Sequence, residues 1–253
     1  MNLAILVRSE ILKTKRTASL YFTLIAAAVV PAIILLSALT DDIKGIKNDP
    51  LNGYIKLASE MNGLFFFPWF IILTCTLLPQ IEYKNNTWKQ VFTSPAAKVN
   101  IITAKYLTVH LLMLLFLLST HLFMLIAILL ANFIQPTLGL LNHLLDSDKI
   151  IANATNNYLT MLAVCSIQFW FGLRFKNFIV PVAIGFTLWL TGTLLALYFN
   201  SSIANYFPYS FQVFSNSPQH KLHLSKVVWA SVAYAILFSF ICYMDLRRKR
   251  MNN

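Results

Sequence analysis

The charged side chains that could form specific contacts gather in the stretch 81–105. It reads IEYKNNTWKQVFTSPAAKVNIITAK and separates two long apolar runs. Its single acid is Glu82, and its bases are Lys84, Lys89, Lys98 and Lys105. A carboxylate at the start of a helix interacts favourably with the helix dipole, and it also pairs with basic side chains of a neighbouring helix or protein. The chemistry predicted here is ion pairing rather than bond making.

The centre of this stretch has the pattern of a short amphipathic helix. Trp88, Val91 and Phe92 follow an i, i+3, i+4 spacing, which places them on one helical face. Lys84 and Lys89 fall on the opposite face. Aromatic side chains anchor protein interfaces, and they also anchor segments in the membrane interface. The pattern therefore predicts a surface helix that either docks into a soluble partner or lies in the bilayer interface.

Two histidines and a glutamine lie within apolar runs. His110 and His121 are eleven residues apart, so they fall on nearly the same face of one helix. Ionisable side chains inside a membrane are functional candidates, and Gln168 adds a polar group in another run. We expect these three residues to contribute to a substrate pathway. The alternative is that each forms a hydrogen bond that ties two helices together.

No pattern in the sequence indicates catalysis. The apolar runs contain no paired carboxylates, no nucleophile beside a base and no metal-ligand cluster. Cys75, Cys165 and Cys242 lie singly within these runs, which favours small core residues. None of the seven glycines belongs to a G-x-x-x-x-G-K-[ST] phosphate-binding loop. We therefore expect no catalytic residue, no metal and no cofactor bound by this chain.

The composition places the chain among membrane proteins. Hydrophobic residues make up 58% of its 253 residues and charged residues only 11%, whereas a soluble domain has about 25% charged residues. Apolar runs of about membrane-spanning length recur along the chain. They predict an all-α integral membrane fold with six transmembrane helices, over residues 18–39, 63–78, 106–133, 158–173, 178–197 and 227–243. The polar segments 41–62 and 135–157 are expected to be loops.

We expect one transmembrane domain over residues 1–253, with two further segments at the membrane surface. Residues 1–16 predict an amphipathic helix in the interface, whose apolar face holds Leu3, Ala4, Val7, Ile11 and Leu12. Its basic face would meet anionic headgroups, so membrane lipid is an expected partner. Residues 198–226 form an outer segment, whose aromatic residues predict contact with the membrane interface.

The basic residues are distributed unevenly around the predicted spans. With both termini in the cytoplasm, 14 of the 20 lysines and arginines lie in cytoplasmic segments. An excess of lysine and arginine in cytoplasmic loops is the usual orientation signal of membrane proteins. The same residues account for the net charge of +11, so we expect no nucleic-acid partner.

The stretch 81–105 resembles the first cytoplasmic loop of ABC-2-type transporter permeases. In that family an acid follows the second span, then Gly-Thr or Asn-Thr, a short helix, a Ser-Pro break and a lysine that opens the third span. The matching residues here are Glu82 to Thr87 (EYKNNT), Ser94-Pro95 and Ala104-Lys105. Asn86 stands where many members have glycine. More narrowly, the loop is similar to that of the small bacterial permeases of the lantibiotic and bacteriocin immunity group.

The resemblance implies a permease without its own motor, in the bacterial cytoplasmic (inner) membrane. A separate cytoplasmic ABC ATPase subunit would bind ATP and Mg, and a second permease subunit, identical or a sister, would complete the channel. The short helix would be a coupling helix that docks into the ATPase, and the outer segment would cap the exit. The residues implied in docking are Glu82, Asn86, Thr87, Trp88, Val91, Phe92 and Lys105. The expected function is export of a hydrophobic or amphipathic substrate, such as an antimicrobial peptide.

The alternative is a gradient-driven transporter or a non-transporting membrane scaffold. A proton-coupled carrier usually has acids within its spans, whereas all nine acids here lie outside the predicted spans or at their ends. Such carriers also often contain an internal repeat, and none is visible in the sequence. A soluble ATPase partner would discriminate the two hypotheses.

Overall fold

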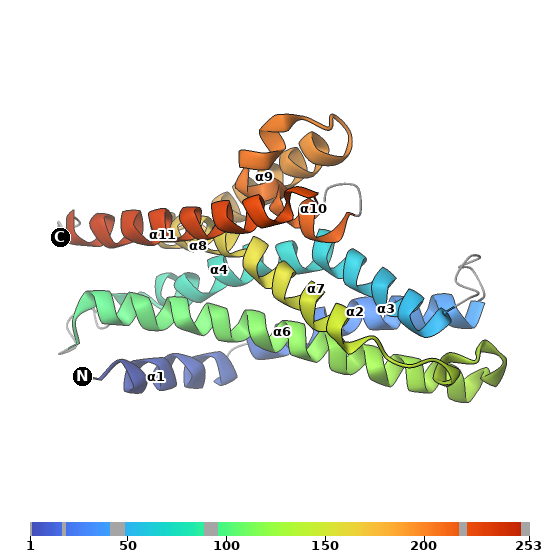
Figure 1. Ribbon diagram of the computed structural model, residues 1–253. Coiled ribbons are helices and arrows are strands. Elements are labelled where there is room, and N and C mark those ends of the chain that lie inside the picture. Colours follow the sequence, from blue (N-terminus) through green and yellow to red (C-terminus); the bar gives the residue numbers. More distant parts are fainter. Residues whose placement is uncertain (1, 17–18, 41–48, 89–95, 218–221, 249–253) are drawn as a thin grey trace.

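The computed structural model describes residues 2–16, 19–40, 49–88, 96–217 and 222–248, and these residues form an all-α bundle (Figure 1). The helices are α1 (Leu3–Arg16), α2 (Ser19–Thr40), α3 (Pro50–Met61), α4 (Phe67–Lys84), α6 (Lys98–Ile134), α7 (Ser147–Thr160), α8 (Leu162–Arg174), α9 (Ile179–Leu197), α10 (Phe211–Asn216) and α11 (Leu224–Arg248). A π-helical turn, η1 (Asn62–Phe66), joins α3 to α4. Short 3-10 turns are η2 (Pro136–Leu138), η3 (Leu140–Asn142), η4 (Ser202–Tyr206) and η5 (Pro208–Ser210).

The two ends of the bundle differ. Helix α1 begins and α11 ends at the left of Figure 1, where α4 also ends and α6 begins. We call this the terminus end. At the opposite end, which we call the far end, α6 finishes and both α3 and α7 begin. The loop 81–105 and the N-terminal helix are thus neighbours at the terminus end.

Most of the expected spans coincide with long apolar helices. Five stretches of the described residues are long and apolar enough to cross a membrane: Ser19–Thr40, Pro50–Lys84, Lys98–Ile134, Ile179–Leu197 and Leu224–Asp245. The span expected over 158–173 corresponds to α8, which has 13 residues and is separated from α7 by a turn at Met161. Thirteen residues give about 20 Å, less than the ~30 Å hydrocarbon core. The multi-pass helical fold is confirmed, and the count of six spans stays a prediction.

The loops expected over 41–62 and 135–157 are helical in their second halves, so the loop prediction is wrong there. Helix α3 starts after Asp49, whose carboxylate accepts a hydrogen bond from the Asn52 backbone N–H. Pro50 occupies its first turn, where its missing N–H costs nothing. Helix α7 starts after Asp146, whose carboxylate likewise accepts a hydrogen bond from a backbone N–H, that of Lys149. Both helices are amphipathic and too polar to resemble spans.

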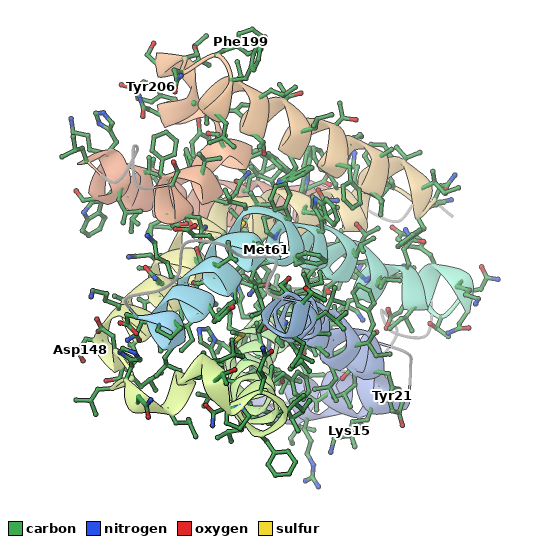
Figure 2. The ribbon with its side chains drawn as sticks, turned by 90° about the vertical axis from the view of Figure 1, so that its right-hand side faces the viewer. Lys15, Tyr21, Met61, Asp148, Phe199 and Tyr206 are labelled. Carbon is green, nitrogen blue, oxygen red and sulfur yellow. The ribbon has the colours of Figure 1, made fainter. Side chains whose placement is uncertain are left out.

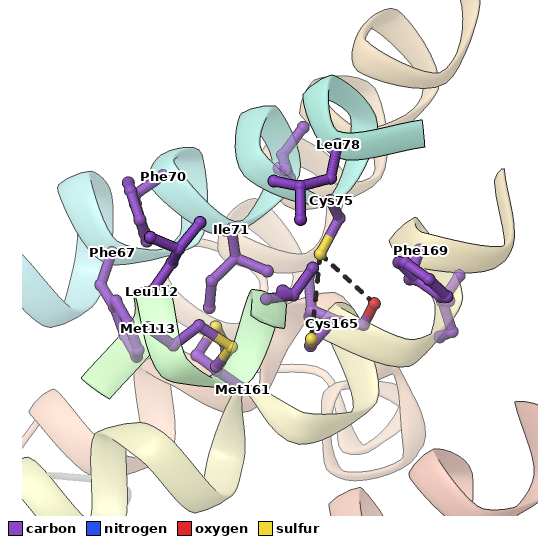
Figure 3. Close-up of a cluster of buried hydrophobic side chains, with 14 of the residues drawn as sticks. Phe67, Phe70, Ile71, Cys75, Leu78, Leu112, Met113, Met161, Cys165 and Phe169 are labelled. Carbon is purple, nitrogen blue, oxygen red and sulfur yellow. Dashed lines mark hydrogen bonds between the residues drawn. The ribbon is translucent and has the colours of Figure 1, made fainter. Parts of the chain in front are cut away.

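The main core lies between α4, α6 and α8 (Figure 3). Its buried side chains include Phe67, Phe70, Ile71, Cys75, Leu78, Leu112, Met113, Met161, Cys165 and Phe169. The sulfurs of Cys75 and Cys165 are 3.8 Å apart, and both are free thiols. Gly172 of α8 lets this helix approach α4 closely, because a Cβ at residue 172 would lie 2.5 Å from the Cys75 carbonyl oxygen. All three cysteines are buried, as expected of core residues.

A second core forms toward the far end, between α2, α3 and the last turns of α6. The buried residues of α2 recur every three or four positions, which is the spacing of a single helical face. This cluster comprises Val30, Ile34 and Ala38 from α2, Leu51, Tyr54, Ile55 and Ala58 from α3, and Met124, Ile128 and Ala131 from α6. This packing buries the apolar face of α3 against the bundle, and the polar face of α3 points away from this core.

The outer segment 198–226 folds back into the protein. Tyr209, Phe211 and Phe214 are buried, whereas we expected the aromatic residues here to contact the membrane interface. Gly192 of α9 makes this packing feasible, because a Cβ at this position would lie 2.5 Å from the Tyr209 backbone. Of the segment's described tyrosines, Tyr198 and Tyr206 are largely exposed, whereas Tyr209 is buried. The segment therefore forms part of the far half of the bundle.

Candidate functional site

The end of α4 sets the direction in which the loop leaves the bundle. Asn86 has a positive φ of 52°, in the left-handed region that favours glycine. The Thr87 N–H donates to the Glu82 carbonyl and the Asn86 N–H donates to that of Tyr83. These bonds form a Schellman motif, the usual end of a helix at a left-handed residue. Because asparagine tolerates this conformation better than most residues, it can stand where related loops have glycine.

Four charged side chains meet directly beneath this helix end. The Lys105 Nζ on α6 lies 2.7 Å from Glu10 Oε2 on α1 and 2.7 Å from Glu82 Oε1 on α4. The Lys13 Nζ on α1 lies 2.6 Å from Glu10 Oε1 and 3.0 Å from the same Glu82 oxygen. We call these four residues the ion network. It links α1, α4 and α6, and its formal charge is zero.

The network is largely removed from water. Lys105 is 0% exposed, Glu82 1% and Glu10 5%. Burial by itself lowers the pKa of Lys13, but hydrogen bonds and charges from Glu10 and Glu82 outweigh it, so this pKa is raised above its ordinary value of 10.5. Glu82 Oε2 is buried and accepts no hydrogen bond within the described part of the chain. The network therefore keeps one unused acceptor in a dry environment.

The predicted docking residues have different surroundings. Trp88 is half-buried, with its ring centroid 5.3 Å from that of Tyr83 and 6.0 Å from the Lys105 ammonium. It packs against its own subunit beside the ion network. Thr87 is half-buried and Asn86 is exposed. Val91, Phe92 and the break at Ser94-Pro95 lie outside the described residues, so their roles stay predictions.

The three residues expected to contribute to a substrate pathway lie apart. Gln168 is 0% exposed and bonds on three sides: to Thr76, to the Pro181 carbonyl and to the Tyr209 hydroxyl. It ties α4, α8, α9 and η5 together, which agrees with the structural alternative. His110 forms a 3.0 Å hydrogen bond with the Tyr158 hydroxyl. Neither residue lines the large cavity described next.

His121 lines a cavity of about 640 Å³ in the far half of the molecule. Its walls are formed mainly by α3 and α7, with contributions from α6 and α10. Our sequence analysis missed this cavity, since it treated both wall segments as loops. The signal was present in the polar residues of 50–61 and 147–160, which recur at helical spacing. It also missed Glu10 and Lys13, although Leu6, Glu10 and Thr14 form one buried stripe.

Comparison with known families decides what kind of protein has this arrangement. A family model described as ABC-2 family transporter protein matches residues 6–192. The chain belongs to the ABC-2 transporter family. The match runs from α1 into α9 and includes all four residues of the ion network. A search of curated proteins finds no match.

Membership in the ABC-2 family confirms the resemblance read from the loop at the family level. It shows a transporter membrane subunit, and subunits of this type have no ATPase activity of their own. The multi-pass membrane location follows from the same match together with the long apolar helices. The narrower likeness to immunity permeases stays a prediction.

Proposed function

We propose that this ABC-2 chain is the membrane-spanning subunit of an ATP-driven exporter in the bacterial inner membrane. A separate ATPase subunit binds ATP and Mg, and a second permease subunit, identical or a sister, completes the transporter. The observation that carries this proposal is the ion network, because it joins α4 and α6, the two helices that flank the loop, to α1 at one buried point. A force applied to the loop therefore reaches α1, α4 and α6 together.

The network is suited to switching between arrangements. Glu82 sits in the last turn of α4, which runs directly into the loop. An unpaired buried acceptor costs about 1–3 kcal/mol, and among the described residues Glu82 Oε2 is such an acceptor. A movement that brings a donor to this oxygen recovers that cost. We infer that docking of the ATPase on the loop shifts the network between two pairings and thereby moves the helices.

The distribution of charge supports a cytoplasmic terminus end. The basic residues of α1, Lys84 at the end of α4 and Lys98 at the start of α6 gather there, and the basic end of α11 lies at the same end. The acids Asp49, Glu60 and Asp146 lie at the far end, around the cavity. Positive charge inside is the expected orientation. Both chain termini are then cytoplasmic, and the cavity lies on the outer side.

The substrate we propose is hydrophobic or amphipathic, such as an antimicrobial peptide removed from the membrane. This follows from the likeness of the loop to immunity permeases and from the large apolar surface that the helices expose to lipid. Of the three proposed pathway residues, His121 is the best placed, because it lines the cavity. His110 and Gln168 would contribute only after the helices rearrange.

The test is co-purification of the tagged chain from its native cell in mild detergent, followed by mass identification. We expect a soluble ATPase in stoichiometric amount. Trp88→Ala removes the aromatic side chain beside the network and should release the ATPase. Trp229→Ala is the matched control, because Trp229 is 74% exposed on α11 and remote from the loop. Both variants should elute as single folded species.

Two outcomes would change the proposal. An ATPase retained by the Trp88→Ala protein keeps the permease function but places the docking site elsewhere. The absence of any ATPase in several detergents contradicts the ATP-driven exporter and favours the gradient-driven transporter.

A further inference from the structure

The cavity at the far end is enclosed by the polar faces of two amphipathic helices. Such faces normally point to solvent. Here Asn52, Lys56, Ser59 and Glu60 of α3 and Asn153 and Asn156 of α7 line the same space of about 640 Å³. Figure 2 looks onto this end, with Met61 at the end of α3 near its centre and Asp148 of α7 at its periphery. The volume of this space falls within the range of small-molecule ligand sites.

The mouth of the cavity is held by a clasp between the two helix starts. The Asn52 side chain donates to the Asp49 carboxylate (2.8 Å) and to the Leu144 carbonyl (2.9 Å). It also accepts a hydrogen bond from the Asp146 backbone N–H (3.0 Å). The two aspartates are occupied as helix caps, and Asp146 also pairs with Lys149. These contacts preform the mouth and leave neither carboxylate free for a ligand.

The cavity wall on the bundle side is a buried polar network. The Asn157 Oδ1 accepts hydrogen bonds from the Ser215 hydroxyl (2.9 Å) and the Asn216 amide (2.8 Å). Gly63 in η1 makes room for the Asn216 side chain, because a Cβ at this position would collide with it. Ser215 and Asn216 line the cavity although each is more than nine-tenths buried. This wall is therefore fixed in place before any ligand binds.

The unused polar groups on the cavity lining are hydrogen-bond acceptors. Asn216 donates through Nδ2, but its Oδ1 accepts no hydrogen bond from the residues that the structure describes. The His121 Nδ1 donates to the Leu117 carbonyl (2.7 Å), so in the neutral ring Nε2 is left as an acceptor. Within the same described residues Glu60 accepts no hydrogen bond, and its nearest cation, Lys56, is 4.0 Å away. Three separate acceptors thus remain available in one cavity.

The charged side chains of the lining also favour a ligand that donates hydrogen bonds. The side chains of Lys56 and Lys149 are 63% and 82% exposed, and the Lys149 ammonium group is already paired with Asp146. The carboxylates are more enclosed, with Glu60 at 32% and Asp146 at 33% exposure. Because Asp49 and Asp146 are occupied as caps and Asp146 is paired with Lys149, Glu60 is the lining carboxylate left for a ligand, beside the acceptors of Asn216 and His121. A donor-rich cation is the ligand that satisfies these groups.

We propose that this cavity binds a ligand through a primary ammonium group, with Glu60 as its counter-ion and Asn216 and His121 as acceptors. The binding itself rests on the cavity alone. Its place on the outer face, as a site for the head of a departing substrate, rests on the proposed function. A lysine side chain and an amino-lipid headgroup carry the same ammonium chemistry.

The test uses the full-length protein in nanodiscs of phosphatidylcholine, whose headgroup has no N–H donor. The probe is the blocked tripeptide acetyl-Ala-Lys-Ala-amide, and binding is followed by saturation-transfer NMR. The comparison peptide has an acetylated lysine of nearly the same shape without the charge. We expect the lysine peptide to bind at least about tenfold more tightly, since a hydrogen-bonded charge contributes more than a neutral one.

Three variants test the residues. Glu60→Gln should weaken binding of the lysine peptide by about tenfold or more. Asp148→Asn makes the same charge change outside the cavity and should leave affinity within about twofold, as expected of an exposed charge. Lys56→Met should tighten binding, because it removes the ammonium group that competes for Glu60. The proposal is overturned if both peptides bind equally, or if Glu60→Gln and Asp148→Asn behave alike.

A second lipid composition separates the two sources of the ammonium group. Nanodiscs that contain phosphatidylethanolamine should compete with the peptide if the natural ligand is a lipid headgroup. Unchanged peptide affinity in these discs assigns the site to a soluble or peptide ligand. No ATPase takes part in the assay, so failure of the cavity site leaves the co-purification result untouched, and failure of the exporter proposal leaves peptide binding untouched.

Discussion

Lys105 illustrates how one buried charge positions three helices. Its ammonium group lies 2.7 Å from a carboxylate oxygen of both Glu10 and Glu82, and the side chain is 0% exposed. Bringing these charges out of water is costly, and their mutual attraction offsets that cost only with good geometry. Such a pair adds little net stability over apolar residues, but losing one partner is expensive. The network therefore specifies the arrangement of α1, α4 and α6 more than it stabilises the fold.

We predict that Lys105→Met lowers the free energy of unfolding by about 3–5 kcal/mol, because two carboxylates stay buried near a single cation. Thermal unfolding in detergent measures the change. Lys84→Met, at an exposed lysine of the same region, should cost no more than about 0.5 kcal/mol. Adding Glu82→Gln to Lys105→Met should restore part of the stability. Equal effects of the two lysine variants would contradict a structural role for the network.

Among the elements, the ends of the helices determine where the functional segments lie. Helix α4 ends in a Schellman motif at Asn86, and α3 and α7 begin at aspartate caps that Asn52 joins. The first of these ends turns the chain so that Trp88 packs beside the ion network, and the other two shape the mouth of the cavity. Local backbone chemistry thus controls both candidate sites.

The left-handed conformation of Asn86 leads to a second prediction. Asn86→Gly should keep or slightly raise stability, because glycine adopts a φ of 52° without strain. Asn86→Val should lower the free energy of unfolding by about 1–2 kcal/mol. Asn85→Val is the control, since Asn85 has a negative φ of −92° and should change stability by less than about 0.5 kcal/mol. Melting midpoints in detergent rank the three variants, and equal losses at both positions would refute the assignment.

The clasp at the far end should open in acid. The hydrogen bond from the Asn52 side chain lowers the pKa of Asp49, and that from Lys149 lowers the pKa of Asp146, each from an ordinary value of 3.8. A lowered pKa stabilises the folded state above pH 3.8, and this contribution is lost as the pH falls through the lowered values. Hydrogen exchange, corrected for its intrinsic rate, should quicken in the first turns of α3 and α7 between pH 5 and pH 2.5. Helix α9 has no acid in its first turn and serves as the reference; equal acceleration there would count against the clasp.

The limits of sequence reasoning are clearest for α3 and α7. The long apolar runs predicted α2 and α9 within one residue and α11 within about five, because span length and hydropathy are local properties. Helix α6 begins at Lys98, eight residues before its predicted start, because its first turns are too polar to resemble a span. The short polar helices were mistaken for loops, since α3 depends on packing against α2 and α6, and α7 depends on packing mainly against α10 and α11. Glu82 and Lys105 were recognised from the loop, but Glu10 was not. Its contact with Lys105 joins residues 95 positions apart, which no local pattern reveals.

On the scale of the whole molecule, the two candidate sites are separated along the length of the bundle. The ion network and most basic residues lie at the terminus end, and the acceptor-lined cavity lies at the far end. Helix α6 connects the two, and its 37 residues extend about 55 Å, longer than the ~30 Å hydrocarbon core. Motion of α6 would therefore link an ATPase on one side to a ligand on the other.

This separation requires that the two ends face opposite sides of the membrane with the terminus end inside. We predict that a membrane-impermeant maleimide labels Asp148→Cys in intact cells, because Asp148 is exposed on the far end. Lys84→Cys, which is exposed at the end of α4, should react only after the membrane is permeabilised. The unmodified protein is the background control, since all three of its cysteines are buried. The reverse pattern would place the cavity in the cytoplasm, and the ammonium site would then receive a substrate on entry rather than release it on exit.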